Sequence, residues 1–140
     1  MTTELSERLR EKNLKVTPKR TAVIELFLSR RRCFGPQDVW RAVKPSFGRL
    51  GLPSVYRILE ELRGAGVLER VEKRDRQLYY VLCTAPRPCH HHHFVCRKCG
   101  RVEEVDFCNI RELERFIERR LGCKAESHSL RVEGLCARCR

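Results

Sequence analysis

Apolar residues in the first half of the chain recur at intervals of three and four, which is the period of helices that bury one face. Thr17 before Pro18 predicts the start of one such helix, because threonine caps a helix N-terminus and proline suits its first position. Four helices are predicted, and they begin near Glu4, Thr17, Pro36 and Pro53. Their inward-facing apolar residues are Leu5, Leu9, Ala22, Val23, Leu26, Phe27, Val39, Trp40, Val43, Val55, Ile58, Leu59 and Leu62.

Two short strands are predicted to follow the helices, at residues 67–71 and 77–82, on either side of a charged turn. Helices followed by a basic two-stranded ribbon are typical of a winged helix-turn-helix, whose recognition helix enters the major groove of DNA. Tyr56 and Arg57 lie outside the apolar face of the fourth helix and near its start, so we expect them to contact DNA. A solvated helix face is the alternative for either residue taken alone.

A second, smaller domain is predicted after a proline-rich link. The segment 84–88 holds two prolines within three residues, which disfavour a helix and favour an extended connection. Beyond the link, strands predicted at residues 101–106 and 124–132 flank an amphipathic helix. The apolar residues of that helix are Ile110, Leu113, Phe116, Ile117 and Leu121. We therefore divide the chain into residues 1–83, a hinge at 84–89 and residues 90–140, and assign the fold class α+β.

The net charge favours a polyanionic partner. The chain carries 30 Lys and Arg against 18 Asp and Glu, a formal charge of +12. Residues 1–83 hold 18 basic and 10 acidic residues, a net charge of +8, against +4 for the remainder. Together with the helix pattern, this positive field predicts binding to nucleic acid. No apolar run approaches the ~20 residues that cross a bilayer, and the first residues lack a signal-peptide pattern, so we expect a protein of the reducing cytoplasm with no membrane partner.

Nine cysteines in a reducing compartment favour metal binding over disulfides. Cys96 and Cys99 form one Cys-x-x-Cys pair, and Cys136 and Cys139 form a second. Four thiolates in two such pairs can close a tetrahedron around Zn²⁺, so we predict a structural zinc site. A redox pair is the alternative, but it needs one exposed Cys-x-x-Cys motif with a depressed thiol pKa, which two distant pairs fit poorly.

Four consecutive histidines, His90 to His93, precede the first pair. In an extended segment alternate side chains face opposite ways, so His91 and His93 project to one side and His90 and His92 to the other. Imidazole is a common ligand of transition metals, and two metal sites on opposite faces are therefore expected. Because histidine titrates near neutrality, pH sensing is an alternative role for the run.

The motifs, taken together and in order, resemble the ferric uptake regulator (Fur) family over nearly the whole chain. They are the segments 14–20 and 54–59, the histidine run leading into Cys96-x-x-Cys99-Gly100, the segment His128-Ser129-Leu130 and the final cysteine pair. The resemblance implies a bacterial, homodimeric, metal-dependent transcription regulator with an N-terminal winged helix and a C-terminal α/β dimerisation domain. It also implies palindromic double-stranded DNA as the partner. The residues expected at the DNA are Lys15, Arg20, Ser54, Tyr56 and Arg57.

The sensed metal must be judged position by position. Iron-sensing members are expected to place a histidine before the third helix and a glutamate near the end of the wing, where this chain has Cys33 and Val81. A peroxide-sensing, PerR-like member is expected to place oxygen ligands such as aspartate around Fe²⁺, and neither Val81 nor Cys83 supplies one. These departures argue against both branches.

The zinc-sensing Zur branch fits better. Its members are expected to use an acidic residue at the start of the wing, a cysteine at its end and two alternate histidines of the run. The matching residues here are Glu69, Cys83, His91 and His93. A thiolate with imidazoles suits Zn²⁺ better than a hard metal, so we predict zinc as the regulatory metal and keep Fe²⁺ or Mn²⁺ as the alternative.

A third site is expected on the other face of the histidine run, from His90, His92 and His128. The family usually adds a glutamate from the long helix, but this chain has Arg111 there with Glu112 beside it, so the site is either incomplete or rearranged. Cys89 or Cys33 could replace Cys83 as the hinge ligand. Cys108 and Cys123 receive no role.

An enzyme is the competing class of function, either a thiol oxidoreductase or a zinc hydrolase. A hydrolase needs an open coordination position and a carboxylate base near the bound water. The histidine run has neither the His-Glu-x-x-His nor the His-x-Glu arrangement that would supply one. We therefore predict a metal-dependent repressor without catalytic residues.

Overall fold

The computed structural model describes residues 3–72, 77–83, 92–105, 108–126, 128 and 130–140. The chain divides into two compact units, Met1–Thr84 and Ala85–Arg140. Within the described residues, no helix has the length and apolar character needed to span a membrane.

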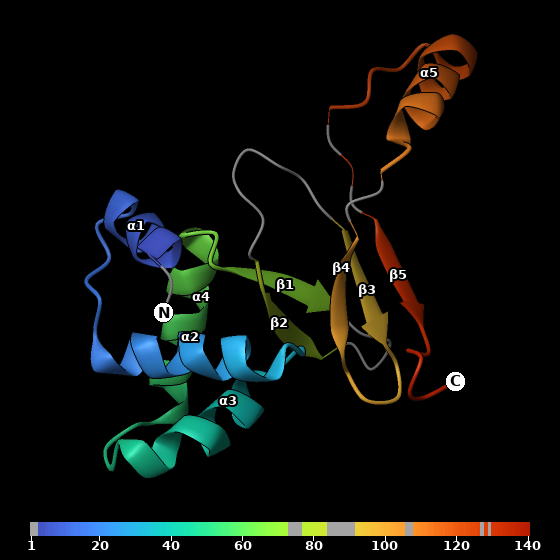
Figure 1. The fold of residues 1–140 in the computed structure, drawn as a ribbon. Coiled ribbons are helices and arrows are strands. Elements are labelled where there is room, and N and C mark those ends of the chain that lie inside the picture. The colour runs from blue at the N-terminus through green and yellow to red at the C-terminus, as the bar shows by residue number, and fades with distance from the viewer. Residues whose placement is uncertain (1–2, 73–76, 84–91, 106–107, 127, 129) are drawn as a thin grey trace. The chain divides into compact units, whose positions relative to one another are not determined.

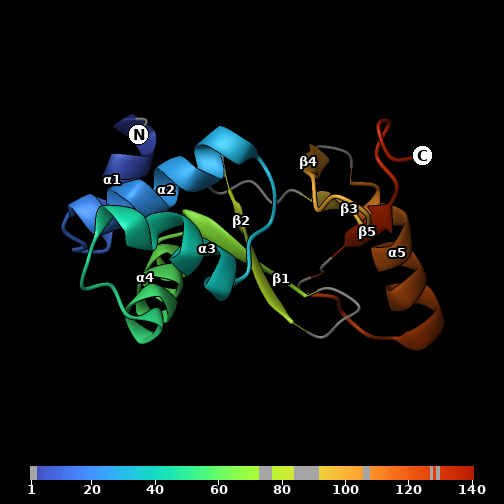
Figure 2. The same cartoon turned by 90° about the horizontal axis from the view of Figure 1, so that it is seen from below.

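The first unit is a bundle of four helices followed by a two-stranded ribbon. The helices gather on one side of the ribbon, and α2 runs across α4 (Figures 1 and 2). The helices are α1 (Thr3–Glu11), α2 (Pro18–Arg30), α3 (Pro36–Val43) and α4 (Leu52–Gly64), with a short 3₁₀ turn at Lys44–Ser46 after α3. The antiparallel ribbon consists of β1 (Leu68–Glu72) and β2 (Leu78–Leu82). The predicted winged helix-turn-helix is confirmed.

Local sequence signals set the ends of α2. The Thr17 hydroxyl accepts a hydrogen bond from the Arg20 N–H at 3.3 Å, and Pro18 occupies the first helical position. This cap satisfies one of the N–H groups that a helix leaves unbonded at its start. The helix ends at Arg31, which adopts a left-handed conformation with φ 40° and donates its N–H to the Phe27 carbonyl.

The ribbon is attached to α4 through the most deeply buried tyrosine. Tyr80 is fully buried in β2, and its hydroxyl donates to the Glu60 carboxylate of α4. Burial and the adjacent Glu60 raise the pKa of Tyr80 to about 12, while the Tyr80 hydrogen bond and the nearby Arg63 and Arg70 lower the pKa of Glu60. At neutral pH Tyr80 therefore stays protonated and Glu60 stays ionised, as this hydrogen bond requires. The wing and the helix predicted to enter DNA are thus fixed to each other.

Arg8 closes the base of the ribbon from the N-terminal helix. Its side chain is 6% exposed and forms an ion pair with Glu4 in the same helix. One guanidinium nitrogen donates to the carbonyls of Gly66 and Cys83, both at 2.9 Å. Since Gly66 precedes β1 and Cys83 follows β2, one arginine holds both strands where they enter and leave the ribbon.

The second unit contains a three-stranded sheet and one helix. The strands are β3 (His92–Cys96), β4 (Val102–Val105) and β5 (Arg131–Gly134), and the helix is α5 (Ile110–Leu121). In the sheet β3 lies between β4, which is antiparallel to it, and β5, which is parallel (Figure 1). Gly134 lies so near the Phe94 ring that a β-carbon would stand 3.0 Å from it, which allows β5 to approach β3 closely.

The last strand differs from the prediction of residues 124–132. Only Arg131 and Val132 of that range are in β5, and the strand continues to Gly134. Its register explains the shift: Arg131 to Gly134 pair with His93 to Cys96, so the strand spans only the part of the chain that lies beside β3.

The two units differ sharply in apolar burial. The first unit has a contiguous core that contains most of the predicted inward-facing residues, joined by Phe34, Val67 and Leu68. Ile24 is also buried in this core although it was not predicted to face inward, whereas Ala22, Leu26 and Trp40 are only partly buried against it. Among the described residues of the second unit, the buried apolar side chains are Val95, Cys96 and Cys136. None of the residues of α5 is buried. The large exposed apolar side chains of this unit are Leu113, Phe116, Leu121, Leu130, Val132 and Leu135.

Replacing Arg8 by methionine tests the closure of the ribbon. Arg8→Met keeps an apolar stem but leaves the carbonyls of Gly66 and Cys83 without their charged donor. We expect the free energy of unfolding to fall by about 1.5–3 kcal/mol, the range for hydrogen bonds from charged groups. Urea unfolding followed by circular dichroism measures it, with Arg10→Met, an exposed position on the same helix, as the control. Equal stability of the two variants would contradict the role of Arg8.

Candidate metal centres and nucleic-acid interface

Four thiols converge where β3 and β5 end. Cys96 is the last residue of β3, and the chain turns so that the Gly100 N–H reaches the Cys96 carbonyl at 2.9 Å. Gly100 adopts φ 72°, a conformation that glycine enters without steric cost. Cys136 follows β5, and a second turn brings Cys139 back to it, with its N–H 2.8 Å from the Cys136 carbonyl. Each Cys-x-x-Cys pair thus forms one turn, and the parallel pairing of β3 with β5 brings the two turns together.

The spacing of the sulfurs suits a metal ion and not a disulfide. The ligand atoms of Cys96, Cys99, Cys136 and Cys139 all lie within 4.8 Å of one another. The Cys99 and Cys136 sulfurs are 3.7 Å apart. A disulfide requires about 2.05 Å, whereas two thiolates on a tetrahedral zinc at about 2.3 Å stand roughly 3.8 Å apart. The four predicted cysteines therefore lie close enough together to hold one metal ion as a tetrathiolate site.

Hydrogen bonds within the cluster separate the pKa values of its thiols. The Cys136 N–H donates to the Cys96 sulfur at 3.4 Å, and this bond with other backbone donors lowers the pKa of Cys96 to about 6. The hydrogen bond between the Cys139 and Cys136 thiols, followed by burial, raises the pKa of Cys139 to about 12. Four sulfurs at this spacing ionise together only beside a positive charge, which a divalent cation supplies.

A second group of potential metal ligands includes His128. The ligand atoms of His92, Cys108 and His128 lie within 4.8 Å of one another. His92 is 4% exposed in β3, and its ring centroid is 5.3 Å from that of His128. Two of these residues were expected in a third site; the third expected member, His90, lies outside the described residues. Arg111 and Glu112 are exposed on α5.

Cys108 is the member of this group that the sequence analysis missed. Its sulfur lies 3.3 Å from Nε2 of His128, although 20 residues separate them. A lone cysteine without a Cys-x-x-Cys partner carries no spacing signal. The only available hint was the surplus of cysteines over the four that make the paired motif.

The residues expected at the hinge site come from both units. The Cys83 N–H donates to the Val67 carbonyl at 2.9 Å, which continues the register that pairs Glu69 with Val81. Glu69 and Cys83 are therefore diagonal neighbours on one face of the ribbon. His93 is 6% exposed in β3, on the opposite strand face from His92, and His91 lies outside the described residues.

The remaining cysteines have different surroundings. Cys33 is buried in the first unit, where it is 3% exposed. Cys123 is exposed beyond the end of α5. Neither belongs to a group of potential metal ligands among the described residues. Cys89 lies outside those residues.

The start of α4 presents the side chains expected to contact DNA. Its apolar residues face the core, whereas Tyr56 is 42% exposed and the Arg57 side chain is 75% exposed. Ser54 is half-buried, and Lys15 is exposed in the loop before α2. Tyr56 and Arg57 are the residues of this helix start with the reach and exposure that a groove contact needs.

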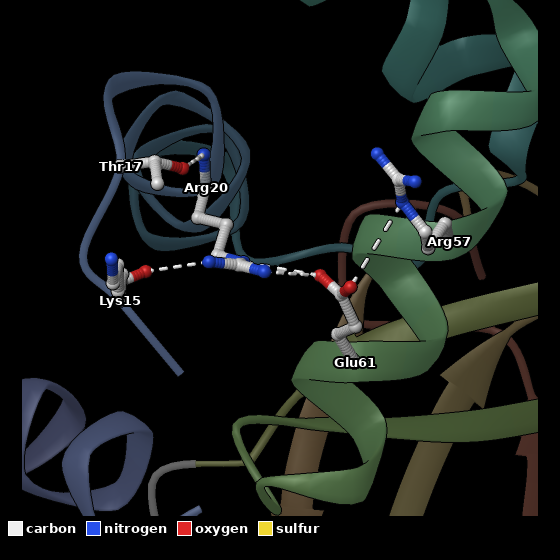
Figure 3. Close-up of polar contacts among 5 residues, drawn as sticks. All are labelled: Lys15, Thr17, Arg20, Arg57 and Glu61. Carbon is white, nitrogen blue, oxygen red and sulfur yellow. Dashed lines mark hydrogen bonds and ion pairs between the residues drawn. The ribbon is translucent and has the colours of Figure 1, made fainter. Parts of the chain in front are cut away.

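The Arg20 side chain forms its hydrogen bonds inside the protein (Figure 3). Its Nε and Nη2 atoms donate to Oε2 of Glu61 at 3.1 and 2.6 Å, and Nη1 donates to the Lys15 carbonyl at 2.7 Å. The Arg20 side chain is 15% exposed. Oε1 of Glu61 faces Arg57 at 3.9 Å, so Glu61 lies between the two arginines. Arg20 therefore packs α2 against α4, while Arg57 projects from the surface.

The sequence and the fold are both similar to those of known proteins. The sequence model of the Ferric uptake regulator family matches residues 11–133. The ferric uptake regulation protein of Bacillus subtilis (strain 168) is 32% identical over 136 residues, which are 96% of this chain and 91% of that protein. The structure of the ferric uptake regulator from Francisella tularensis with iron has a TM-score of 0.66 and 28% identity, covering 90% of this chain and 94% of the other. A zinc uptake regulator complexed with zinc and DNA has a TM-score of 0.75 and 23% identity, covering 99% and 95%.

Replacing Cys136 by serine tests the tetrathiolate site. Cys136→Ser removes one of the four sulfurs, so we expect loss of one tightly held metal ion per chain and loss of a stable dimer. Metal content after dialysis and the mass in solution measure these effects. Cys123→Ser is the control, because Cys123 is outside the cluster. Wild-type metal content and mass in Cys136→Ser would rule out the site.

A pair of arginine variants separates surface contact from internal packing. Arg57→Ala should weaken binding to duplex DNA by about 1–3 kcal/mol per lost contact and leave thermal stability unchanged. Arg20→Met should lower thermal stability, because it leaves the half-buried Glu61 without its main partner. Fluorescence anisotropy and thermal melting measure the two effects. Unchanged DNA binding in Arg57→Ala would remove this residue from the interface.

Proposed function

The chain belongs to the ferric uptake regulator family of metal-responsive transcription regulators, and we propose that the metal it senses is zinc. It is a regulator and not an enzyme. The observation that carries the zinc assignment is the cysteine at the end of the wing, Cys83, a diagonal neighbour of Glu69 on the ribbon. With His91 and His93 these residues form a set of one carboxylate, one thiolate and two imidazoles. Thiolate and imidazole ligands favour Zn²⁺ over Mn²⁺.

The positions that the resemblance associates with iron support this reading. A histidine is expected before the third helix and a glutamate near the end of the wing, but these positions hold Cys33 and Val81. Cys33 is 3% exposed and Val81 is 1% exposed. Neither offers an imidazole or a carboxylate, so the set expected for iron lacks two members in this chain.

We assign a second zinc ion to Cys96, Cys99, Cys136 and Cys139. The closeness of the four sulfurs supports this assignment, and a site filled by four cysteines has no open position for a substrate. This ion has a structural role in the proposal. It ties the segment after β5 to the end of β3.

The regulator acts as a homodimeric repressor of the bacterial cytoplasm. The exposed apolar side chains of α5 supply the surface for a second copy of the chain, because soluble proteins rarely leave large apolar patches in water. The residues of this surface are Leu113, Phe116 and Leu121. A dimer related by a two-fold axis presents two α4 helices, which matches a palindromic operator.

The hinge site links metal binding to DNA binding by changing the fraction of molecules whose units are oriented to bind DNA. Glu69 and Cys83 belong to the first unit, and His91 and His93 belong to the second. Their joint coordination of Zn²⁺ selects the unit orientations in which two α4 helices reach major grooves about 34 Å apart. Without zinc, only a fraction of molecules is competent, and the apparent DNA affinity falls by that fraction.

Replacing Cys83 by alanine tests the zinc assignment. Cys83→Ala leaves at most three hinge ligands, so we expect at least a tenfold loss of zinc-activated binding to operator DNA, with the dimer and the tetrathiolate zinc retained. Fluorescence anisotropy at buffered free zinc, under reducing conditions, measures the response. Cys33→Ala and Cys89→Ala are the matched controls, and each should respond to zinc like the wild type.

Two outcomes would contradict the proposal. An ordinary zinc response in Cys83→Ala would remove this residue from the sensing site. DNA binding that responds to Fe²⁺ and not to Zn²⁺ in the wild-type protein would move the chain to the iron-sensing branch.

A further inference from the structure

A second group of potential metal ligands that includes a cysteine lies in the second unit, apart from the four-cysteine cluster. It combines His92 of β3, Cys108 from the segment before α5, and His128 from the segment after α5. All three ligand atoms lie within 4.8 Å of one another. His92 is almost fully buried, and Cys108 and His128 are half-buried. The group is therefore preassembled from three separate parts of the chain.

The distances within the group match those around a tetrahedral ion. On zinc, a sulfur at about 2.3 Å and a nitrogen at about 2.0–2.1 Å stand roughly 3.6 Å apart. The Cys108 sulfur and Nε2 of His128 are 3.3 Å apart, and the His92 and His128 rings are 5.3 Å apart with an interplanar angle of 47°. The three ligand atoms are thus close enough together to share one ion.

The ligand types define the kind of ion. Within the described residues, the group contains two imidazoles and one thiol and no carboxylate. Arg111 occupies the position on α5 where the resemblance expects a glutamate, and its side chain is exposed. A thiolate in place of a carboxylate shifts preference from Mn²⁺ toward Zn²⁺ or Co²⁺.

We propose that Cys108 is a metal ligand that, with His92 and His128, forms a site for a thiolate-preferring divalent cation such as Zn²⁺. Cys108 releases its thiol proton to solvent on binding, and the thiolate forms the metal bond. The ligands come from β3 and from both sides of α5, so binding ties the two ends of this helix connection to the sheet. Since none of the α5 residues is buried within a single chain, this tie orders a helix that packing inside the chain does not hold.

Cobalt absorption tests the site because a cobalt–thiolate bond gives a charge-transfer band that an all-nitrogen site lacks. The protein is the full-length Cys83→Ala variant with its tetrathiolate site filled by zinc, so the hinge thiolate cannot contribute. We expect added Co²⁺ to produce the band, and the band to disappear when Cys108→Ser is combined with Cys83→Ala. Cys123→Ser in the same background is the control and should keep it. Zinc content measured at the end checks that cobalt has not displaced the tetrathiolate ion.

Alkylation of the wild-type protein gives a second test that needs no variant. Zn²⁺ should slow the modification of Cys108 by iodoacetamide at least tenfold, while exposed Cys123 reacts at the same rate with and without zinc. Mass spectrometry of the peptides reports each cysteine separately. A cobalt band that survives in Cys83→Ala/Cys108→Ser, or equal alkylation of Cys108 with and without zinc, would overturn the assignment. Either result leaves the zinc response of DNA binding unaffected, so the two proposals fail separately.

Discussion

Sulfur atoms gathered at the ends of β3 and β5 are the constraint on which the second unit depends. The described residues of this unit bury only three apolar side chains, Val95, Cys96 and Cys136, and two of these carry sulfurs of the cluster. Within one chain, so small a described core offsets little of the conformational entropy that folding costs. In the proposed site, coordination of an ion would supply folding free energy that this apolar burial does not. The parallel pairing of β3 with β5 and the thiol cluster therefore support each other.

The first unit is stabilised by a buried apolar core, so its stability does not depend on the residues exposed at its surface. Its core is continuous, and buried polar groups fix the helices to the ribbon, as in the bond from Tyr80 to Glu60. The net charge of this unit overstates how many basic side chains are available to DNA, because some arginines form ion pairs inside the unit. Arg20 and Arg57 both face Glu61, but one is enclosed by α2 and α4 and the other is exposed to solvent.

The sequence predicted features whose causes are local and missed those that depend on distant contacts. Thr17 and Pro18 define the start of α2 through their own chemistry, and the Cys-x-x-Cys spacing identifies each half of the thiol cluster. The extent of β5 was wrong because it depends on how far β3 runs beside it. Cys108 could not be assigned because its contact with His128 arises only when the chain folds on both sides of α5. The units were predicted as separate bodies, and the ligand sets that join them stay predictions.

The hydrogen bonds around Cys83 affect how sensitive a metal sensor can be. Its N–H donates to the Val67 carbonyl and its carbonyl accepts from Arg8, so two hydrogen bonds restrain the main chain of this proposed ligand. A preorganised ligand loses little entropy on binding, which leaves more of the coordination energy for affinity. If Cys83 is a ligand as proposed, the set-point of the sensor, meaning the zinc concentration at which it responds, is adjustable from α1 through Arg8. Evolution could tune that threshold through a helix that contributes no ligand.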